Sequence, residues 1–330
     1  MALSKKWEAI RDHFYSTNLT RVDFERENWQ SYGFSSQEIF HGLMSRNNIS
    51  VKSRSEYFKN TRPAAIIESF DVDELDNFGI EDSIGKDYTS AKLPENLKKI
   101  GILSDIHVPF HSLDALTCAI KYLKEQNIDC LYLNGDTFDF YSISRHEREK
   151  DLRDFPREID MCRNFLEKIR SIFPLIPIYF KMGNHENRYQ RYLVSQAEEF
   201  ASLHELQFDK FFRLDKLNIN FVEDWQGMEM GDLLVIHGHE GFGTGGINPS
   251  QSLFNKMFCN TLMGHVHRRT ITTKKNGFGK FINTYSTGCL TSLKPKYMPY
   301  NQHTHGFAMV EINDGESKVK IIDIKDGKIV

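Results

Sequence analysis

The sequence predicts an α/β (α+β) protein in which two packed β-sheets are flanked by helices and preceded by a small helical region. Three observations support this fold class. After residue 98, short apolar runs alternate with helical patterns at 113–123 and 159–169. Beyond residue 218 strand-like runs dominate, whereas the start of the chain shows only helical spacing. The expected strands are 100–103, 130–133, 178–182, 219–222, 233–236, 261–263, 307–312 and 319–322.

Residues 1–63 are expected to form a small helical unit. Trp7, Ile10 and Phe14 recur at helical spacing, and two similar apolar patterns follow. The end of this unit is basic, so it is either a helix-turn-helix-like module that binds nucleic acid or a solvated helical face. Its candidate nucleic-acid-binding residues are Arg46, Lys52, Arg54 and Lys59.

Residues 64–97 reverse the sign of the charge, with nine acidic residues against two lysines. This stretch lacks sustained periodicity and is expected to be a linker or an extended wrap. Residues 98–330 then form the main domain. With 330 residues, 40% of them hydrophobic, the chain is long enough for a large core.

The bulk composition excludes several classes of protein. A net charge of −3 gives no global attraction to nucleic acid or anionic lipid, so any such binding must be local. No apolar run reaches the roughly 18–20 residues of a membrane span, and no membrane partner is expected. Five widely separated cysteines indicate free thiols in a reducing compartment, and hence a cytoplasmic location.

Polar side chains follow directly on five of the expected strands. Ligands of open α/β sheets bind beyond the carboxyl ends of strands, so these clusters should converge. Carboxylate, imidazole and amide groups are suitable ligands for Mn, Fe or Zn. One such cluster is common by chance as a solvated loop or a helix cap, but five in this order are not. The clusters are Asp105 and His107, Asp136 and Asp139, Asn184 and His185, His237 and His239, and His265 and His267.

The ordered motifs Asp-x-His, Gly-Asp-x-x-Asp, Gly-Asn-His-Glu, His-Gly and Gly-His-x-His resemble the calcineurin-like metallophosphoesterase superfamily over about residues 98–310. The block Gly-Asn-His-Glu-Asn-Arg-Tyr-x-Arg-Tyr is similar to members carried by phages and prophages. The resemblance implies that residues 98–330 are a catalytic domain with the αββα metallophosphoesterase fold. It also implies a dinuclear metal site at the strand ends.

The resemblance further implies a role for each motif residue. His185 would be a histidine near the leaving group that binds no metal, with Asp139 as its carboxylate partner and Glu186 in support. Asp136 would bridge the two metals. The first metal would be held by Asp105, His107, Asp136 and His267, and the second by Asp136, Asn184, His237 and His265.

The chemistry of such a pair of ions is general. Two neighbouring divalent cations lower the pKa of a shared water and neutralise phosphate oxygens, so a metal-bridging hydroxide is expected to attack phosphorus. Protonated His185 would donate to the leaving oxygen. Mn is the favoured cofactor, with Fe, Zn or Ni as alternatives.

Candidate substrate contacts surround these clusters. Arg188 and Arg191 would share one face of a helix that follows the Gly-Asn-His-Glu motif, where they either bind phosphate or form a solvated face. Tyr141 and Arg145 lie in a charged rim loop, and His239 follows a ligand motif. The glycine-rich stretch 241–246 lacks the lysine of a P-loop and is interpreted as a flexible rim.

The identity of the phosphate ester is narrowed by one departure from a known pattern. Phe140 and Tyr141 stand where the serine/threonine protein phosphatases of this superfamily carry Arg-Gly. This departure argues against a phosphoprotein phosphatase. The presence of His185 favours a phosphodiesterase or nuclease acting on nucleic acid or nucleotides. The alternatives are a phosphomonoesterase for a small molecule or phosphoprotein, and a non-catalytic metal-binding or nucleic-acid-binding module.

Overall fold

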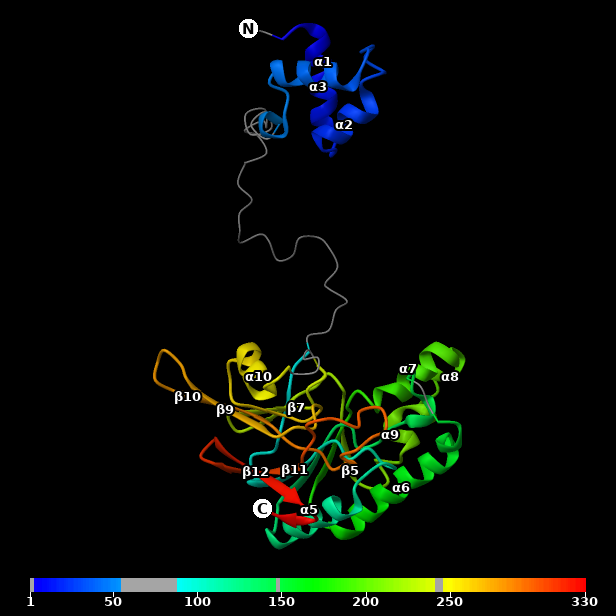
Figure 1. The fold of residues 1–330 in the computed structure, drawn as a ribbon, viewed down its shortest axis with the longest axis vertical. Coiled ribbons are helices and arrows are strands. Elements are labelled where there is room, and N and C mark those ends of the chain that lie inside the picture. Colours follow the sequence, from blue (N-terminus) through cyan, green and yellow to red (C-terminus); the bar gives the residue numbers. More distant parts are fainter. Residues whose placement is uncertain (1–2, 55–87, 147–148, 241–245) are drawn as a thin grey trace, which may run out of the picture. The chain divides into compact units, whose positions relative to one another are not determined.

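The computed structural model describes residues 3–54, 88–146, 149–240 and 246–330 (Figure 1). The chain divides into two units, Met1–Ile84 and Gly85–Val330, and each has its own hydrophobic core. No helix of the described residues is long and apolar enough to cross a membrane.

The first unit is a small helical bundle. Thr20 and Ser36 begin two of its helices, because each hydroxyl accepts a hydrogen bond from the backbone three residues on. Its core is aromatic and aliphatic and includes Ile10, Phe14 and Phe40. The helices are α1 (Lys5–Ser16), α2 (Arg21–Asn28) and α3 (Gln37–Arg46).

The basic residues of this unit differ in their surroundings. Arg54 donates from Nη1 to the carbonyl oxygens of Thr17 and Leu19, at 2.9 and 3.2 Å, and its guanidinium lies 4.9 Å from the Phe14 ring centre. It therefore holds the helical unit together. Arg46 and Lys52 are exposed, while Lys59 lies outside the described residues. Nucleic-acid binding by this patch stays a prediction.

The second unit is built on two mixed sheets. The larger one has the order β13-β12-β11-β2-β3-β4-β5, in which β2 to β5 are parallel and β11 to β13 are antiparallel. Its apolar central strands are buried on both faces, as parallel strands usually are. Its strands are β2 (Lys99–Leu103), β3 (Cys130–Asn134), β4 (Ile178–Lys181), β5 (Ile219–Val222), β11 (His305–Asn313), β12 (Glu316–Lys325) and β13 (Lys328–Ile329).

The smaller sheet has the order β1-β6-β7-β8-β10-β9. Its edge strand β1 pairs with β6, and nearby Leu93 and Leu97 are buried, so the chain joins this unit ahead of residue 98. The strands are β1 (Ala91–Lys92), β6 (Met228–Met230), β7 (Leu233–Ile236), β8 (Thr261–Met263), β9 (Thr270–Lys275) and β10 (Phe281–Ser286).

Two cores divide this unit into layers. One lies between the sheets, where side chains such as Ile102, Tyr132 and Val235 meet. The other lies under the helices α5 (Leu113–Glu125) and α6 (Phe155–Ile172), which run along the larger sheet (Figure 1). The α/β fold of two sheets flanked by helices is therefore confirmed, as are both expected helices and all eight expected strands. The β9–β10 hairpin was not predicted.

Candidate metal centre

The predicted ligands lie just beyond the carboxyl ends of β2, β3, β4, β7 and β8. Five of them have a left-handed backbone with φ between 50° and 67°. That conformation is costly for residues other than glycine, and it concentrates at functional sites. The five are Asp105, His107, Asp136, His265 and His267.

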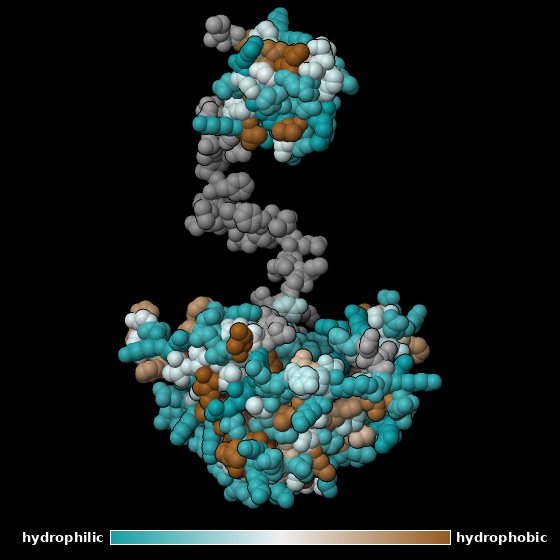
Figure 2. Space-filling view, viewed as in Figure 1, coloured by the Kyte–Doolittle hydropathy of each residue, from teal (hydrophilic) through white to brown (hydrophobic). Residues whose placement is uncertain are grey.

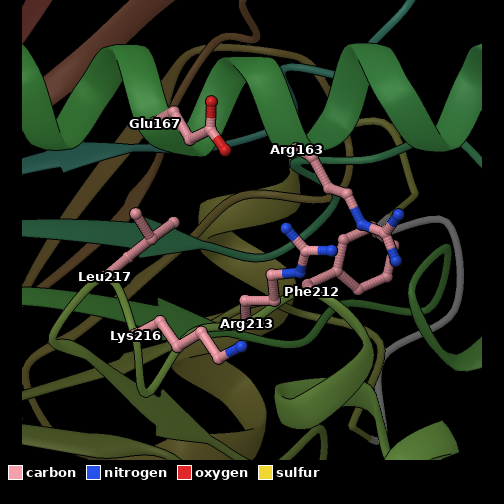
Figure 3. A pocket seen from close by; sticks show the side chains of 6 residues that line it. All are labelled: Arg163, Glu167, Phe212, Arg213, Lys216 and Leu217. Carbon is pink, nitrogen blue, oxygen red and sulfur yellow. The ribbon is translucent and has the colours of Figure 1, made fainter.

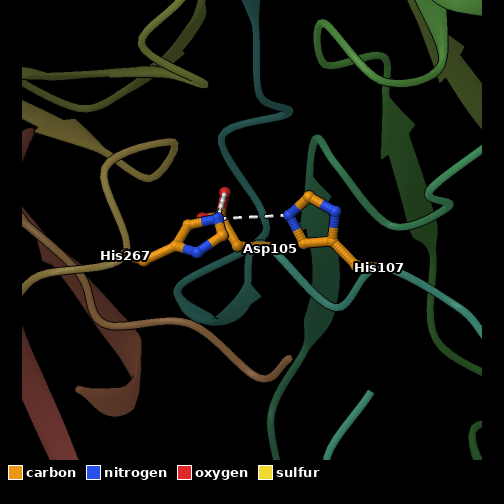
Figure 4. A group of neighbouring side chains, drawn as sticks. All are labelled: Asp105, His107 and His267. Atoms are coloured by element: carbon orange, nitrogen blue, oxygen red, sulfur yellow. Dashed lines mark hydrogen bonds and ion pairs between the residues drawn. The ribbon is translucent and has the colours of Figure 1, made fainter. Parts of the chain in front are cut away.

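Asp105, His107 and His267 form one group of buried donor atoms (Figure 4). The Nε2 atoms of the two imidazoles are 3.1 Å apart, and Nε2 of His267 lies 3.2 Å from Oδ1 of Asp105. The three side chains point toward one another from two different sheets. Convergent nitrogens and a carboxylate at these distances can hold one cation between them.

Asp136, His237 and His265 form the second group. Nε2 of His237 lies 3.3 Å from Oδ2 of Asp136 and 3.2 Å from Oδ1 of Asn184. Oδ2 of Asp136 is also 3.8 Å from Nε2 of His107, a member of the first group. Asp136 therefore stands between the groups, as a bridging ligand must.

The outer nitrogens of two imidazoles are fixed by hydrogen bonds. His107 Nδ1 lies 3.0 Å from Oδ2 of Asp139, and His237 Nδ1 lies 2.8 Å from the carbonyl oxygen of Asn134. Because both acceptors lack a hydrogen, each Nδ1 must donate, which leaves each Nε2 free as a ligand. The same arrangement orients histidines in many metal sites.

The donor set fits a pair of divalent cations. Asp105 and Asp136 are buried, and among the described residues only histidines lie within ion-pair distance of them. Burial, with the positive field of His237, lowers the pKa of His265 to about 4, so its imidazole is neutral and its buried Nδ1 has no hydrogen-bond partner. A neutral imidazole beside ionised carboxylates can bind metal without first losing a proton.

Burial disfavours the protonated form of His237, but the carboxylates of Asp136, Asp105 and Glu240 together outweigh burial and raise the pKa of His237 to about 10. The carboxylates of the centre therefore stabilise positive charge beside them. Two divalent ions would neutralise these carboxylates more fully than one proton does.

Close backbone approach explains two of the glycines in the motifs. A Cβ atom at Gly183 would collide with Asp136, and one at Gly264 would collide with Ser104 and Asp105. Neither position tolerates a side chain while the ligands keep their places.

His185 lies beside both groups and is held by its own backbone. Its N–H donates to Oδ1 of Asp136 at 2.9 Å, and its Nδ1 lies 3.0 Å from the carbonyl oxygen of Asp139. Arg188 donates from Nη2 to Nε2 of His185 at 2.9 Å and from Nη1 to the same carbonyl. The Asp139 carboxylate is shared, with Oδ2 3.0 Å from Nδ1 of His107 and 3.4 Å from Nδ1 of His185.

The predicted substrate contacts separate into inner and outer residues. Arg188 belongs to the centre, whereas Arg191 is exposed on the same helix, α7 (Asn187–Gln196). Tyr141 packs on Phe110, and its hydroxyl accepts a hydrogen bond from the backbone N–H of Glu149.

Arg145 and His239 are the remaining candidates, and they differ in burial. Arg145 is exposed on the rim. His239 is largely buried, and its ring centre is 5.4 Å from that of His237 and 6.5 Å from that of His265.

The carboxylate of Glu186 joins two ligand loops. It accepts backbone N–H groups of Asp136, Phe138 and Gly183 at 2.8–3.0 Å. Burial and the nearby Asp136 raise the pKa of Glu186. The fourth position of Gly-Asn-His-Glu was the signal for this residue, although the sequence indicated only a supporting role.

A buried ion pair behind the centre was not predicted from the sequence. Lys181 is fully buried at the end of β4, and its Nζ is 3.0 Å from Oε1 of Glu240. Glu240 also accepts the backbone N–H groups of His237 and Gly238. The position of His303 was also not predicted, and its ring centre lies 4.7 Å from that of His267.

A separate hollow of about 180 Å³ lies away from the centre, against α6 (Figure 3). None of the predicted site residues lines it. Its polar side chains include Arg163, Glu167 and Arg213, and the Arg163 guanidinium lies 4.8 Å from the ring centre of Phe211. The donor geometry of a metal centre is absent from this hollow.

Two sheets flanked by helices, with carboxylate, imidazole and amide donors gathered at the strand ends, define the class of metal-dependent phosphoesterases. The chain belongs to the calcineurin-like phosphoesterase family, whose model matches residues 98–276. The family predicted from the ordered motifs is therefore confirmed, and with it a phosphate-ester hydrolase. The roles assigned to individual ligands stay predictions.

Curated relatives include two proteins of mycobacterial phages. The Gene 54 protein of Mycobacterium phage L5 is 24% identical over 249 residues, which is 70% of this chain and 95% of the relative. The Gene 54 protein of Mycobacterium phage D29 is 23% identical over 251 residues, with the same coverage. This chain is thus similar to phage proteins along nearly their whole length.

Similar solved structures include Vps29 of Cryptosporidium parvum, 12% identical with a TM-score of 0.41 over 71% of this chain and 95% of that one. Vps29 of Entamoeba histolytica, complexed with zinc, is 16% identical with a TM-score of 0.35 over 70% and 96%. A dimetal phosphatase from Danio rerio is 10% identical with a TM-score of 0.36 over 68% and 96%.

Proposed function

We propose that this chain hydrolyses a phosphodiester bond in a nucleic acid or nucleotide, with two divalent cations, preferably Mn, as cofactors. The observation that carries the proposal is the pair of buried donor groups joined by Asp136, with His185 beside both. Asp105, His107, Asp136 and His267 would hold one ion, and Asp136, Asn184, His237 and His265 the other.

Ions bound there would supply Lewis-acid stabilisation of phosphate oxygens and a water of lowered pKa. The remaining chemistry belongs to the protein. His185 donates from Nδ1 to the Asp139 carbonyl, so Nε2 is the atom that carries or releases a proton. In the free protein Arg188 donates to that same Nε2.

Arg188 would change its partner when substrate binds. A phosphate oxygen is a stronger acceptor for a guanidinium than an imidazole nitrogen, because the hydrogen bond is then assisted by opposite charges. Movement of Nη2 from His185 to phosphate would leave Nε2 free to take up a proton from solvent, which it could then donate to the leaving oxygen. Phosphate binding and protonation of the general acid would thus be coupled through one residue.

The surroundings of Phe140 support a diester over a phosphoprotein. Protein phosphatases of this superfamily have arginine at the matching position, where it clamps phosphate. Here Phe140 is fully buried and lies 5.8 Å from Tyr189 between ring centres. Its side chain serves the core, so this position has no group to bind the second and third oxygens of a phosphomonoester.

The proposal is tested with two synthetic esters. After chelation and reloading with Mn, Fe, Zn or Ni, the protein should cleave bis-(p-nitrophenyl) phosphate with a higher kcat/KM than p-nitrophenyl phosphate. The control Arg191→Ala removes an exposed arginine of α7, the helix that also carries Arg188, and should leave both rates unchanged. A clear preference for the monoester would contradict the diesterase.

The first unit could contribute nucleic-acid binding through Arg46 and Lys52, which are exposed. The double variant Arg46→Glu/Lys52→Glu of the full chain should weaken a gel shift of DNA at low salt. The same shift in both proteins would remove this part of the proposal and leave the diesterase untouched.

A further inference from the structure

One continuous part of the chain has an extreme charge composition. Between Glu240 and Glu311 lie 70 residues with eight lysines and arginines and no aspartate or glutamate. The other 260 residues contain the remaining 34 basic residues and all 45 acidic ones. A chain with a net charge of −3 therefore carries a strongly positive segment, and this segment includes two of the predicted metal ligands, His265 and His267.

The β9–β10 hairpin presents much of this positive charge. Lys274, Lys275 and Lys280 are exposed, and no acidic side chain of the described residues pairs with them. In the same hairpin Phe278 is fully exposed and Phe281, which follows Lys280, is 60% exposed. Nζ of Lys275 lies 5.7 Å from the ring centre of Phe281. Exposed aromatic rings among unpaired lysines need a physical reason, because burial would stabilise them.

The hairpin extends away from the metal centre as an edge of the sheet. β8 pairs only with residues 284–286 of β10, so the outer half of the hairpin projects beyond it (Figure 1). β9 begins three residues after His267 and runs outward for six residues. At about 3.3 Å per residue, a track along β9 extends roughly 17 Å from the site.

A second element with lysines and exposed aromatic rings is the loop that precedes His303. The loop at 293–301 carries Lys294, and also Lys296, whose Nζ lies 3.2 Å from Oε2 of Glu149. Tyr297 is 76% exposed and Tyr300 is 96% exposed. The loop ends two residues before His303, whose ring centre lies 4.7 Å from that of His267, so this end of the loop lies beside the site. Figure 2 shows that, on the face in view, the surface of this unit is mostly hydrophilic with apolar residues scattered among the polar ones.

We propose that the β9–β10 hairpin and the loop at 293–301 form a binding track for single-stranded nucleic acid that leads to the metal centre. The inference rests on the proposed phosphodiesterase function and names its substrate class. Lysines follow the phosphates, and exposed rings stack on unpaired bases. Duplex DNA hides its base faces, so rings on the hairpin would gain nothing from it.

The test distinguishes binding of the nucleic acid along the track from hydrolysis at the metal centre. The variants Lys274→Glu/Lys275→Glu and Phe278→Ala/Phe281→Ala are compared with the wild type on a fluorogenic single-stranded oligonucleotide, as DNA and as RNA. Each should lower kcat/KM at least tenfold, mainly through KM, and the charge variant should also flatten the salt dependence. Turnover of bis-(p-nitrophenyl) phosphate should stay within twofold, which also shows that the variants fold.

Lys216→Glu/Lys318→Glu is the matched control, because it reverses two exposed lysines outside the positive segment. Unchanged oligonucleotide kinetics in both hairpin variants, with normal diester turnover, would refute the track alone. Absence of diester turnover in the wild type would instead refute the proposed function. Binding to anionic lipid vesicles that the hairpin variants lose, without any effect on oligonucleotides, would assign the hairpin to a membrane surface and overturn the proposal.

Discussion

Replacing Lys181 by methionine should destabilise the second unit by about 3 kcal/mol. Burial opposes ionisation of Glu240, yet the Lys181 ammonium, with lesser help from His237, His239 and the Gly238 N–H, holds the pKa of Glu240 at about 2 instead of its ordinary value of 4.5. At 1.36 kcal/mol per pH unit that difference is about 3 kcal/mol. Removing one partner of a buried pair costs about 3–5 kcal/mol in other proteins. Nζ of Lys181 also donates to the carbonyl oxygens of Glu223 and Asp224.

Urea unfolding of the metal-free protein measures this cost. Trp225 is the only tryptophan of the second unit, so Trp7→Phe/Trp29→Phe in the background makes its fluorescence specific. Lys210→Met is the control, because Nζ of Lys210 lies 3.2 Å from Oδ2 of Asp215 at the surface. Exposed pairs contribute less than about 1 kcal/mol.

A double-mutant cycle combines Lys181→Met with Glu240→Gln. The double variant should lower the free energy of unfolding by less than the two single variants together, because no unpaired charge remains buried. The lowered pKa of Glu240 means that its contribution is fully present above pH 4.5 and is lost as the pH falls toward 2. The stability difference between wild type and Glu240→Gln should therefore shrink below pH 4.5. Additive single effects, or a cost of Lys181→Met equal to that of Lys210→Met, would refute the reasoning.

Three further variants test the centre itself. Asp136→Asn should lose both metals and all turnover, as measured by elemental analysis and diester hydrolysis, because its carboxylate serves both donor groups. His185→Ala should keep both metals but lower kcat by about 10²–10⁴, the usual contribution of a general acid, and loss of metal would contradict its assigned role. Glu186→Gln should weaken metal affinity more than it lowers kcat of the fully loaded protein, because its carboxylate positions ligand loops and touches no substrate.

The ligand clusters could be predicted because each is a local pattern. An apolar run that ends in Asp105 and His107, or in Asn184 and His185, marks a strand and the residues that follow it. Parallel neighbours then bring such ends to the same edge of a sheet, and β2, β3 and β4 are parallel neighbours. The meeting of these residues required no knowledge of side-chain packing.

The supporting residues could not be predicted, because their partners are distant in the sequence. Lys181 stands at the end of a strand-like run, where a lysine usually reaches solvent, and Glu240 lies 59 residues further on. The β9–β10 hairpin was missed because its polar threonines and lysines conceal the alternation of an edge strand. The buried residues of its two strands are Thr272, Ile282, Thr284 and Ser286. Burial of that kind depends on the neighbouring sheet and helix.

The metal centre spans both sheets, and this arrangement makes its geometry depend on the core between them. Asp105, Asp136 and Asn184 follow strands of the larger sheet, whereas His237 and His265 follow strands of the smaller one. Each donor group therefore closes only when the sheets pack in register through the intervening core. Glu186 ties together two loops of one sheet, and the Lys181–Glu240 pair ties one of those loops to the other sheet. Two buried carboxylates outside the donor groups thus set the spacing of the carboxylates and imidazoles that hold the ions.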